Sequence, residues 1–353
     1  MASFQAVVSM AAAIIIIIIA MDACIGQSLP SFSAIIIFGD STVDTGNNNY
    51  IPTAFKGNHP PYGQRFPGKI PTGRFSDGML VPDLLASALG IKDSVPPFLQ
   101  PYLPKEELLT GVSFASAGSG LDELTTIASR VIPMSQQVTM FQKYIEMVKG
   151  IAGEEEAERI INHAFVVISA APNDFIFNYY DIPTRRQQFS IGGYQDFLQL
   201  KLRRFIEGIY KLGCRTILVT GLPPMGCLPI QMTARSLLLR TCLEEENLDA
   251  QIYNAKLVRL LPRIQESLPG STILYSDAYN PMMELINNPQ RHGFVETGQG
   301  CCGTGLLEAG PLCIMRRPTC TNSSEYLFWD SIHPSEATYR YITESLLKGL
   351  WHS

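Results

Sequence analysis

The sequence has few positive charges and no cluster of them. Its 353 residues include 27 Lys and Arg against 32 Asp and Glu, which gives a net charge of -5 at pH 7. Proteins that follow the phosphates of a nucleic acid carry a basic patch or stripe. We therefore expect no nucleic-acid partner. Hydrophobic residues make up 46% of the chain, which is enough for a sizeable folded core.

Several motifs of hydrolytic enzymes are also absent. The chain contains no Gly-x-Ser-x-Gly nucleophile elbow, no P-loop and no His-Glu-x-x-His sequence. Its cysteines form no Cys-x-x-Cys pair and lack zinc-ligand spacing with histidine. These absences argue against an α/β-hydrolase, a nucleotide hydrolase and a zinc enzyme. We expect no metal and no cofactor.

The first 30 residues resemble a secretory signal. An apolar core from Ala6 to Ala20 is too short for a confident membrane span, and small residues follow it. We expect a signal peptide over residues 1–26, with cleavage after Gly26 or Ala23, and one domain over residues 27–353. The usual basic segment is missing, because no Lys or Arg precedes Lys56. An uncleaved anchor or a misassigned start is the alternative.

The cysteines favour export. Apart from Cys24, seven remain, and six of them lie late in the chain and close together, as in disulfide-closed loops of an oxidising compartment. Cys214 is predicted to be a buried free thiol. If Cys227 pairs with Cys242, a loop of that size stabilises the fold by about 3 kcal/mol. Asn322 begins the one N-glycosylation sequon. We expect a secreted, extracellular protein, in the cell wall or apoplast if it comes from a plant, with no stable membrane span.

Short apolar runs alternate with helical patterns along the chain. Residues 35–38, 164–169, 216–220 and 272–275 are rich in β-branched residues and predict buried parallel strands. Helices are predicted over residues 79–89, 135–148, 154–161, 194–212, 244–268, 282–286 and 336–350, and residues 287–328 are predicted to be irregular. This alternation predicts a three-layer α/β/α sandwich with a mainly parallel, doubly wound, flavodoxin-like sheet.

Two polar motifs suggest nucleophilic catalysis. Ser41 directly follows the first strand, at the sheet edge where open α/β proteins place their chemistry. A serine needs a base to take its proton. Asp330 and His333 are three residues apart, so the carboxylate can hold the imidazole by Nδ1 and leave Nε2 for a serine. Taken alone, each motif also fits a polar turn or a capping aspartate beside a surface histidine.

The ordered set of motifs is more specific. Gly-Asp-Ser near the start, Phe-Ala-Ser-x-Gly in the middle, Asn-Asp after the second strand and Asp-x-x-His-Pro near the end resemble the GDSL-motif esterase/lipase family of the SGNH hydrolase superfamily. The likeness is to its plant secreted branch and runs from about Ile35 to Leu350. It includes PTGRFSDG at residues 71–78, GLPPMGCLP at residues 221–229 and CCGTG at residues 301–305.

The resemblance implies a role for each motif. Ser41 would be the nucleophile, His333 the general base and acid, and Asp330 its orienting carboxylate. The oxyanion donors would be the backbone N–H groups of Ser41 and Gly118 and the side-chain amide of Asn173, a neutral donor.

Three positions depart from the family pattern. Ser113 stands where asparagine is usual, Ala171 where glycine is usual, and Thr42 replaces the leucine of the family's name. None of these changes removes a catalytic atom, although Ala171 could shift the loop that presents Asn173.

We therefore expect a serine carboxylic-ester hydrolase that forms an acyl-enzyme. Its substrate would be a small-molecule or polymeric ester, such as a lipid, a polyester or an acylated carbohydrate. Two alternatives stay open, an acyltransferase that uses the same site and a non-catalytic secreted binding protein on the same fold. The sequence leaves the oligomeric state open.

Overall fold

The computed structural model describes residues 31–235 and 237–351, so the expected signal peptide lies outside the described residues. Four parallel strands form the central sheet, in the order β1 Ala34–Gly39, β2 Ala164–Ser169, β3 Thr216–Thr220 and β4 Thr272–Ser276. The sequence predicted these four strands with ends that differ by at most one residue. β1 and β2 are runs of apolar, largely β-branched residues buried on both faces, as is typical inside a parallel sheet, whereas β4 lies at the sheet edge and is partly exposed.

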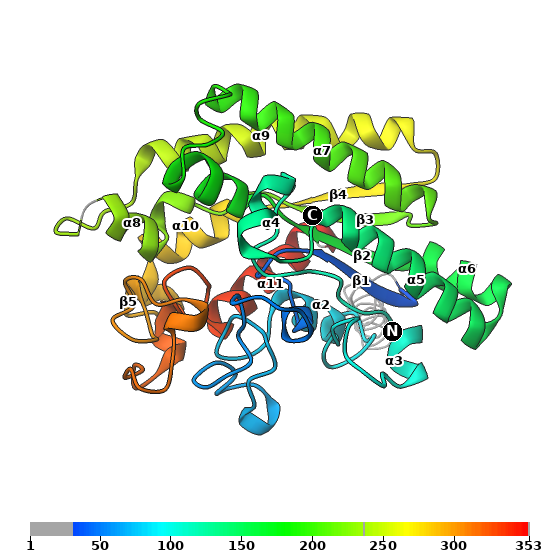
Figure 1. Cartoon of the computed structure of the whole chain (residues 1–353), viewed down its shortest axis with the longest axis horizontal. Coiled ribbons are helices and arrows are strands. Elements are labelled where there is room, and N and C mark those ends of the chain that lie inside the picture. Colours follow the sequence, from blue (N-terminus) through cyan, green and yellow to red (C-terminus); the bar gives the residue numbers. More distant parts are fainter. Residues whose placement is uncertain (1–30, 236, 352–353) are drawn as a thin grey trace, which may run out of the picture.

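Helices cover both faces of this sheet, which confirms the predicted three-layer architecture (Figure 1). The helices are α2 Val81–Ala88, α3 Lys105–Leu109, α4 Glu123–Ser129, α5 Met134–Ala152, α6 Glu154–Asn162, α7 Ile191–Lys211, α8 Pro229–Arg235, α9 Glu244–Ser267, α10 Tyr279–Asn287 and α11 Glu336–Trp351. Along β1, Ile36 and Phe38 pack toward α5, α7 and α9, whereas Ile35 and Ile37 pack toward α2 and α11.

An extended segment over residues 110–116 runs beside the free edge of β1. The backbone N–H of Ile37 donates to Val112, and that of Phe114 donates back to Ile37, at 3.2 and 2.8 Å. After β1 the chain first forms the extended segment along one edge of this strand and later returns as β2 along its other edge. Such a reversal is the place where open α/β sheets bind ligands. Ser41 lies two residues after the end of β1 and so is at this point.

The prediction that residues 287–328 are wholly irregular is wrong. A second, two-stranded parallel sheet joins β5 Glu296–Gly300 to β6 Tyr326–Phe328. Two disulfides, Cys301–Cys320 and Cys302–Cys313, close the chain between them. The glycine-rich β5 has little strand propensity of its own, so its sequence gave no sign of the pairing.

Cys214 is a buried free thiol, as the sequence predicted. Cys227 is bonded to Cys242 across 15 residues, a pairing that the sequence analysis considered and left open. In residues 31–235 and 237–351, no helix is both long and apolar enough to cross a membrane.

Candidate active site

The turn after β1 fixes the backbone that presents Ser41. Gly39 has a φ of 142°, and a Cβ atom there would lie 1.9 Å from the carbonyl oxygen of Ser169, so no other residue fits. The buried side chain of Gln137 on α5 clamps this glycine. Its Oε1 accepts from the Gly39 N–H and its Nε2 donates to the Gly39 carbonyl, both at 2.9 Å. The sequence analysis did not identify Gln137, because its position in the helical pattern gives no sign of this contact.

The structure brings Ser41, His333 and Asp330 into one hydrogen-bonded chain. Oγ of Ser41 lies 2.8 Å from Nε2 of His333, and Nδ1 of His333 lies 2.8 Å from Oδ2 of Asp330. The serine and histidine are 7% and 5% exposed, and the aspartate is fully buried. Ser41 and His333 are 292 residues apart in sequence. A nucleophile, a base and an orienting carboxylate in this geometry can transfer a proton away from the serine hydroxyl.

Local backbone hydrogen bonds hold the Asp330 carboxylate in place. Its Oδ1 accepts from the N–H groups of Ile332 and His333, at 2.9 and 2.7 Å. The N–H of Trp329 donates to the carbonyl of His333 at 2.8 Å and closes the same turn. The Asp-x-x-His spacing therefore forms a compact loop just before α11, and this loop sets the distance between carboxylate and imidazole.

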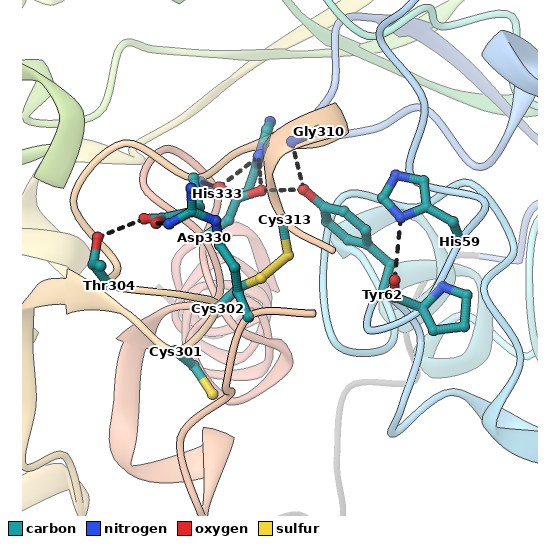
Figure 2. Close-up of a disulfide and its surroundings, with 12 residues drawn as sticks. His59, Tyr62, Cys301, Cys302, Thr304, Gly310, Cys313, Asp330 and His333 are labelled. Carbon is teal, nitrogen blue, oxygen red and sulfur yellow. Dashed lines mark hydrogen bonds and ion pairs between the residues drawn. A yellow bond between two sulfur atoms is a disulfide. The ribbon is translucent and has the colours of Figure 1, made fainter. Parts of the chain in front are cut away.

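Tyr62 is a further contact of this carboxylate, which the sequence analysis missed (Figure 2). Its hydroxyl donates to Oδ2 of Asp330 at 2.7 Å and accepts from the N–H of Gly310 at 2.7 Å. Burial, together with the nearby carboxylate, holds the pKa of Tyr62 well above its usual value. The phenol therefore stays protonated as a donor. Its position in the proline-rich segment before residue 73 gave no signal for this role.

The disulfide-closed segment over residues 301–320 contacts the backbone that leads into Asp330. The N–H groups of Cys301 and Cys302 donate to the carbonyls of Phe328 and Trp329, at 3.0 and 2.8 Å. The Cys302–Cys313 bond closes the loop that carries Gly310, beside Tyr62 and Asp330 (Figure 2). The cysteine-rich region thus supports the backbone just before the aspartate.

The segments with the expected oxyanion donors are tied to the same turn. The side-chain amide of Asn173 donates to the carbonyl of Ser119 at 2.9 Å. Oγ of Ser119 in turn donates to the carbonyl of Gly39 at 2.7 Å. Gly118 has a φ of 87°, a conformation that favours glycine. Asn173 has a second amide hydrogen, and this one can donate to a substrate oxygen.

Two buried carboxylates beside the motifs support loops. Asp174, next to Asn173, accepts from the N–H groups of Leu121 and Asp122 at 2.8 and 3.1 Å. Burial raises its pKa to about 7. Asp40, next to Ser41, accepts from Thr42 through Oδ1, whereas its Oδ2 has no hydrogen-bond partner among the described residues. Burial raises the pKa of Asp40 to about 6.

The three departures from the family pattern have visible local settings. Ala171 has a φ of 103°, a region that favours glycine. Ser113 is buried, and its hydroxyl donates to the carbonyl of Val43 at 3.0 Å. The hydroxyl of Thr42 lies 2.8 Å from Asp40 and 2.9 Å from Ser169 Oγ. Thr42 and Ser113 therefore support the turn at Ser41, and Ala171 carries backbone strain before Asn173.

A cavity opens at the candidate nucleophile. Ser41 and Asn173 both line it, together with aliphatic side chains from the sheet, from α10 and from α11. Among residues 31–235 and 237–351, no group of three or more His, Cys, Asp or Glu side chains could hold a metal ion. Asn322 is exposed, and its sequon lies outside this cavity.

Comparison with known proteins gives one consistent result. Residues 35–346 match the family model described as GDSL-like Lipase/Acylhydrolase. The Arabidopsis thaliana protein GDSL esterase/lipase At2g30310 is 57% identical over 316 residues, which cover 89% of this chain and 88% of that protein. GDSL esterase/lipase At2g30220, from the same plant, is 55% identical over 329 residues, with 92% of each chain covered. GDSL esterase/lipase At2g40250 is 47% identical, with 91% of each covered.

Proposed function

The chain belongs to the GDSL-like lipase/acylhydrolase family and is a hydrolase of the esterase/lipase type, and we propose that it is a secreted serine hydrolase that forms an acyl-enzyme with carboxylic esters. The observation that supports this proposal is the chain of two 2.8 Å contacts from Ser41 through His333 to Asp330. A buried serine with a positioned imidazole is the arrangement that nucleophilic acyl transfer requires.

In the first step Oγ of Ser41 attacks the ester carbonyl carbon while Nε2 of His333 takes the hydroxyl proton. The carbonyl oxygen becomes an oxyanion, stabilised by the N–H groups of Ser41 and Gly118 and by the amide of Asn173. The imidazolium then gives its proton to the alkoxy oxygen, and the alcohol leaves. Asp330 holds the ring in place and stabilises the charge of the imidazolium that forms.

In the second step His333 removes a proton from water as the water oxygen attacks the acyl carbon. The ester bond to Ser41 breaks, the proton returns to its Oγ, and the carboxylic acid leaves. The reaction needs no external oxidant or reductant. An alcohol in place of water would give transfer of the acyl group instead, so the two outcomes differ only in the acceptor.

Hydrolysis of a chromogenic ester tests the assignment. We expect purified protein to release p-nitrophenol from p-nitrophenyl butanoate and the folded Ser41→Ala variant to be slower by at least a thousandfold. Ser271→Ala is a matched control, because this serine donates only to the carbonyl of Leu268 and does not line the cavity. A wild type no faster than Ser41→Ala would favour a binding protein. Ester products that appear only with added alcohol would favour a transferase.

Secretion is the second part of the proposal. Three disulfides and the exposed sequon at Asn322 support it, since disulfides persist in oxidising compartments. The full chain expressed in plant cells should reach the medium with a glycan that an N-glycosidase removes. Asn322→Gln should lack this mass shift. Retention of the wild type inside the cell, without a glycan, would contradict secretion.

A further inference from the structure

The cavity at Ser41 continues into the interior, between the sheet and α11. Its volume is ≈ 90 Å³. By the same kind of measure a cavity needs about 10–15 Å³ to admit one water-sized group. The space therefore admits several methylene groups.

Its two walls run side by side away from the active site. On the sheet side lie Val167 and Leu218, which are aligned neighbours on β2 and β3. On the helix side lie Tyr339, Ile342 and Leu346, spaced at i, i+3 and i+7 and so on one face of α11. At 1.5 Å per residue, the helix wall is roughly 10 Å long from Tyr339 to Leu346.

The polar and the apolar groups that line the cavity occupy different parts of its length. Ser169, Thr220 and Ser276 line the cavity at the carboxyl ends of β2, β3 and β4. The hydroxyl of Tyr339 and Oδ2 of Asp40 are both buried, and neither has a hydrogen-bond partner among the described residues. These groups lie at the level of the active site.

Deeper in the cavity the walls become aliphatic. Val167 and Leu218 lie two residues before the polar ends of their strands, which is roughly 7 Å further from the active site. Ile342 and Leu346 of α11 line the same cavity, and Leu346 belongs to one apolar cluster with Val167 and Leu218. A ligand with a polar head and an unbranched apolar tail matches this order of polar and aliphatic groups.

We propose that this cavity binds the acyl chain of the substrate and gives the enzyme a preference for unbranched chains of medium length. The inference rests on the proposed esterase function and adds the substrate class to it. The acyl carbonyl lies at Ser41 and Asn173, and the tail extends along α11 as far as Leu346. The length of the helix wall, roughly 10 Å, corresponds to roughly an octanoyl chain. Acetyl groups leave most of the cavity unused.

A series of p-nitrophenyl esters with acetyl, butanoyl, octanoyl and hexadecanoyl groups tests this preference. Each buried methylene should raise kcat/KM by about fourfold until the cavity is full. We expect the wild type to be most active on the octanoyl ester. The variant Ile342→Phe should block the cavity at half depth and lower the octanoyl-to-acetyl ratio of kcat/KM at least tenfold.

Glu344→Phe is the matched control, because it adds the same side chain to the exposed face of the same helix. Its ratio should equal that of the wild type. Leu346→Phe serves as a second variant if Ile342→Phe does not fold, and it should shorten the preferred chain by less. An unchanged ratio in the folded variants would overturn the cavity assignment, even where acetyl ester hydrolysis still depends on Ser41. If the wild type hydrolyses none of the esters, the proposed function and the cavity assignment fail together.

Discussion

The hydrogen bond from Tyr62 to Asp330 offers a sharp test of how the active site is held. In Tyr62→Phe the ring stays and only the hydroxyl is lost. The Asp330 carboxylate loses a donor at 2.7 Å, and the N–H of Gly310 loses its acceptor. A hydrogen bond to a charged group contributes about 1.5–3 kcal/mol, and an unpaired buried donor costs about 1–3 kcal/mol. We expect the free energy of unfolding to fall by about 2–4 kcal/mol.

The same change should affect catalysis in a way that lost stability does not. If this bond stabilises the transition state by about 1.4 kcal/mol more than the ground state, its loss lowers kcat about tenfold. KM should change little, because Tyr62 is not among the described residues that line the cavity. Without the phenol, the carboxylate attracts the protonated imidazole more strongly. The acidic limb of the rate profile should therefore move to higher pH.

Tyr144→Phe provides the control for this experiment. Tyr144, on α5, is also fully buried in the hydrophobic core, and its hydroxyl donates to the carbonyl of Leu108 at 2.6 Å. This variant should lose some stability and keep the wild-type kcat and pH profile. The positioning role of Tyr62 would be refuted if folded Tyr62→Phe showed the kcat and pH profile of the wild type.

Three further results are expected. Asn173→Ala should lower kcat about a hundredfold or more with little change in KM, since it removes one oxyanion donor; steady-state kinetics with an unchanged kcat would exclude it from the oxyanion hole. Because burial raises the pKa of Asp40 from 3.8 to about 6, the folded state binds the extra proton, and stability should fall as pH rises from about 4 to 6. Denaturant unfolding should show Asp40→Asn gaining up to about 3 kcal/mol over the wild type between about pH 4 and 8, and parallel pH curves would contradict the shift. The double variant Cys227→Ala, Cys242→Ala should unfold with about 3 kcal/mol less free energy, given the 15-residue separation; a midpoint equal to that of the wild type would refute this.

The central sheet could be predicted because each of its strands has a recognisable pattern in its own short stretch of sequence. Residues 35–38 and 164–169 are apolar runs too short for helices, and they are buried on both faces. The segment 110–116 is different, because its glycine, alanine and serine residues have weak strand propensity. Its extended course depends on hydrogen bonds with β1. Likewise, the pairing of β5 depends on the neighbouring disulfides and on β6, and the five residues of β5 alone do not indicate it.

The candidate site shows the same division between local and long-range information. The Asp330–His333 contact follows from a spacing of three residues, which the sequence displays directly. The approach of Ser41 to His333 spans 292 residues, so only the ordered motifs of the family suggested it. The side chains of Tyr62 and Gln137 contact the site, but neither residue belongs to a sequence motif that indicates such a contact. Contacts of this kind depend on the packed fold and had no signal in the sequence.

Trapping the nucleophile tests the central proposal most directly. A fluorophosphonate that mimics the tetrahedral acyl intermediate should inactivate the full-length enzyme, and mass spectrometry of its peptides should place one adduct on Ser41. The His333→Ala variant should react far more slowly, because the 2.8 Å contact with its Nε2 activates the hydroxyl. Inactivation with the adduct on another residue, or ester hydrolysis that continues while Ser41 is fully modified, would contradict the proposed mechanism.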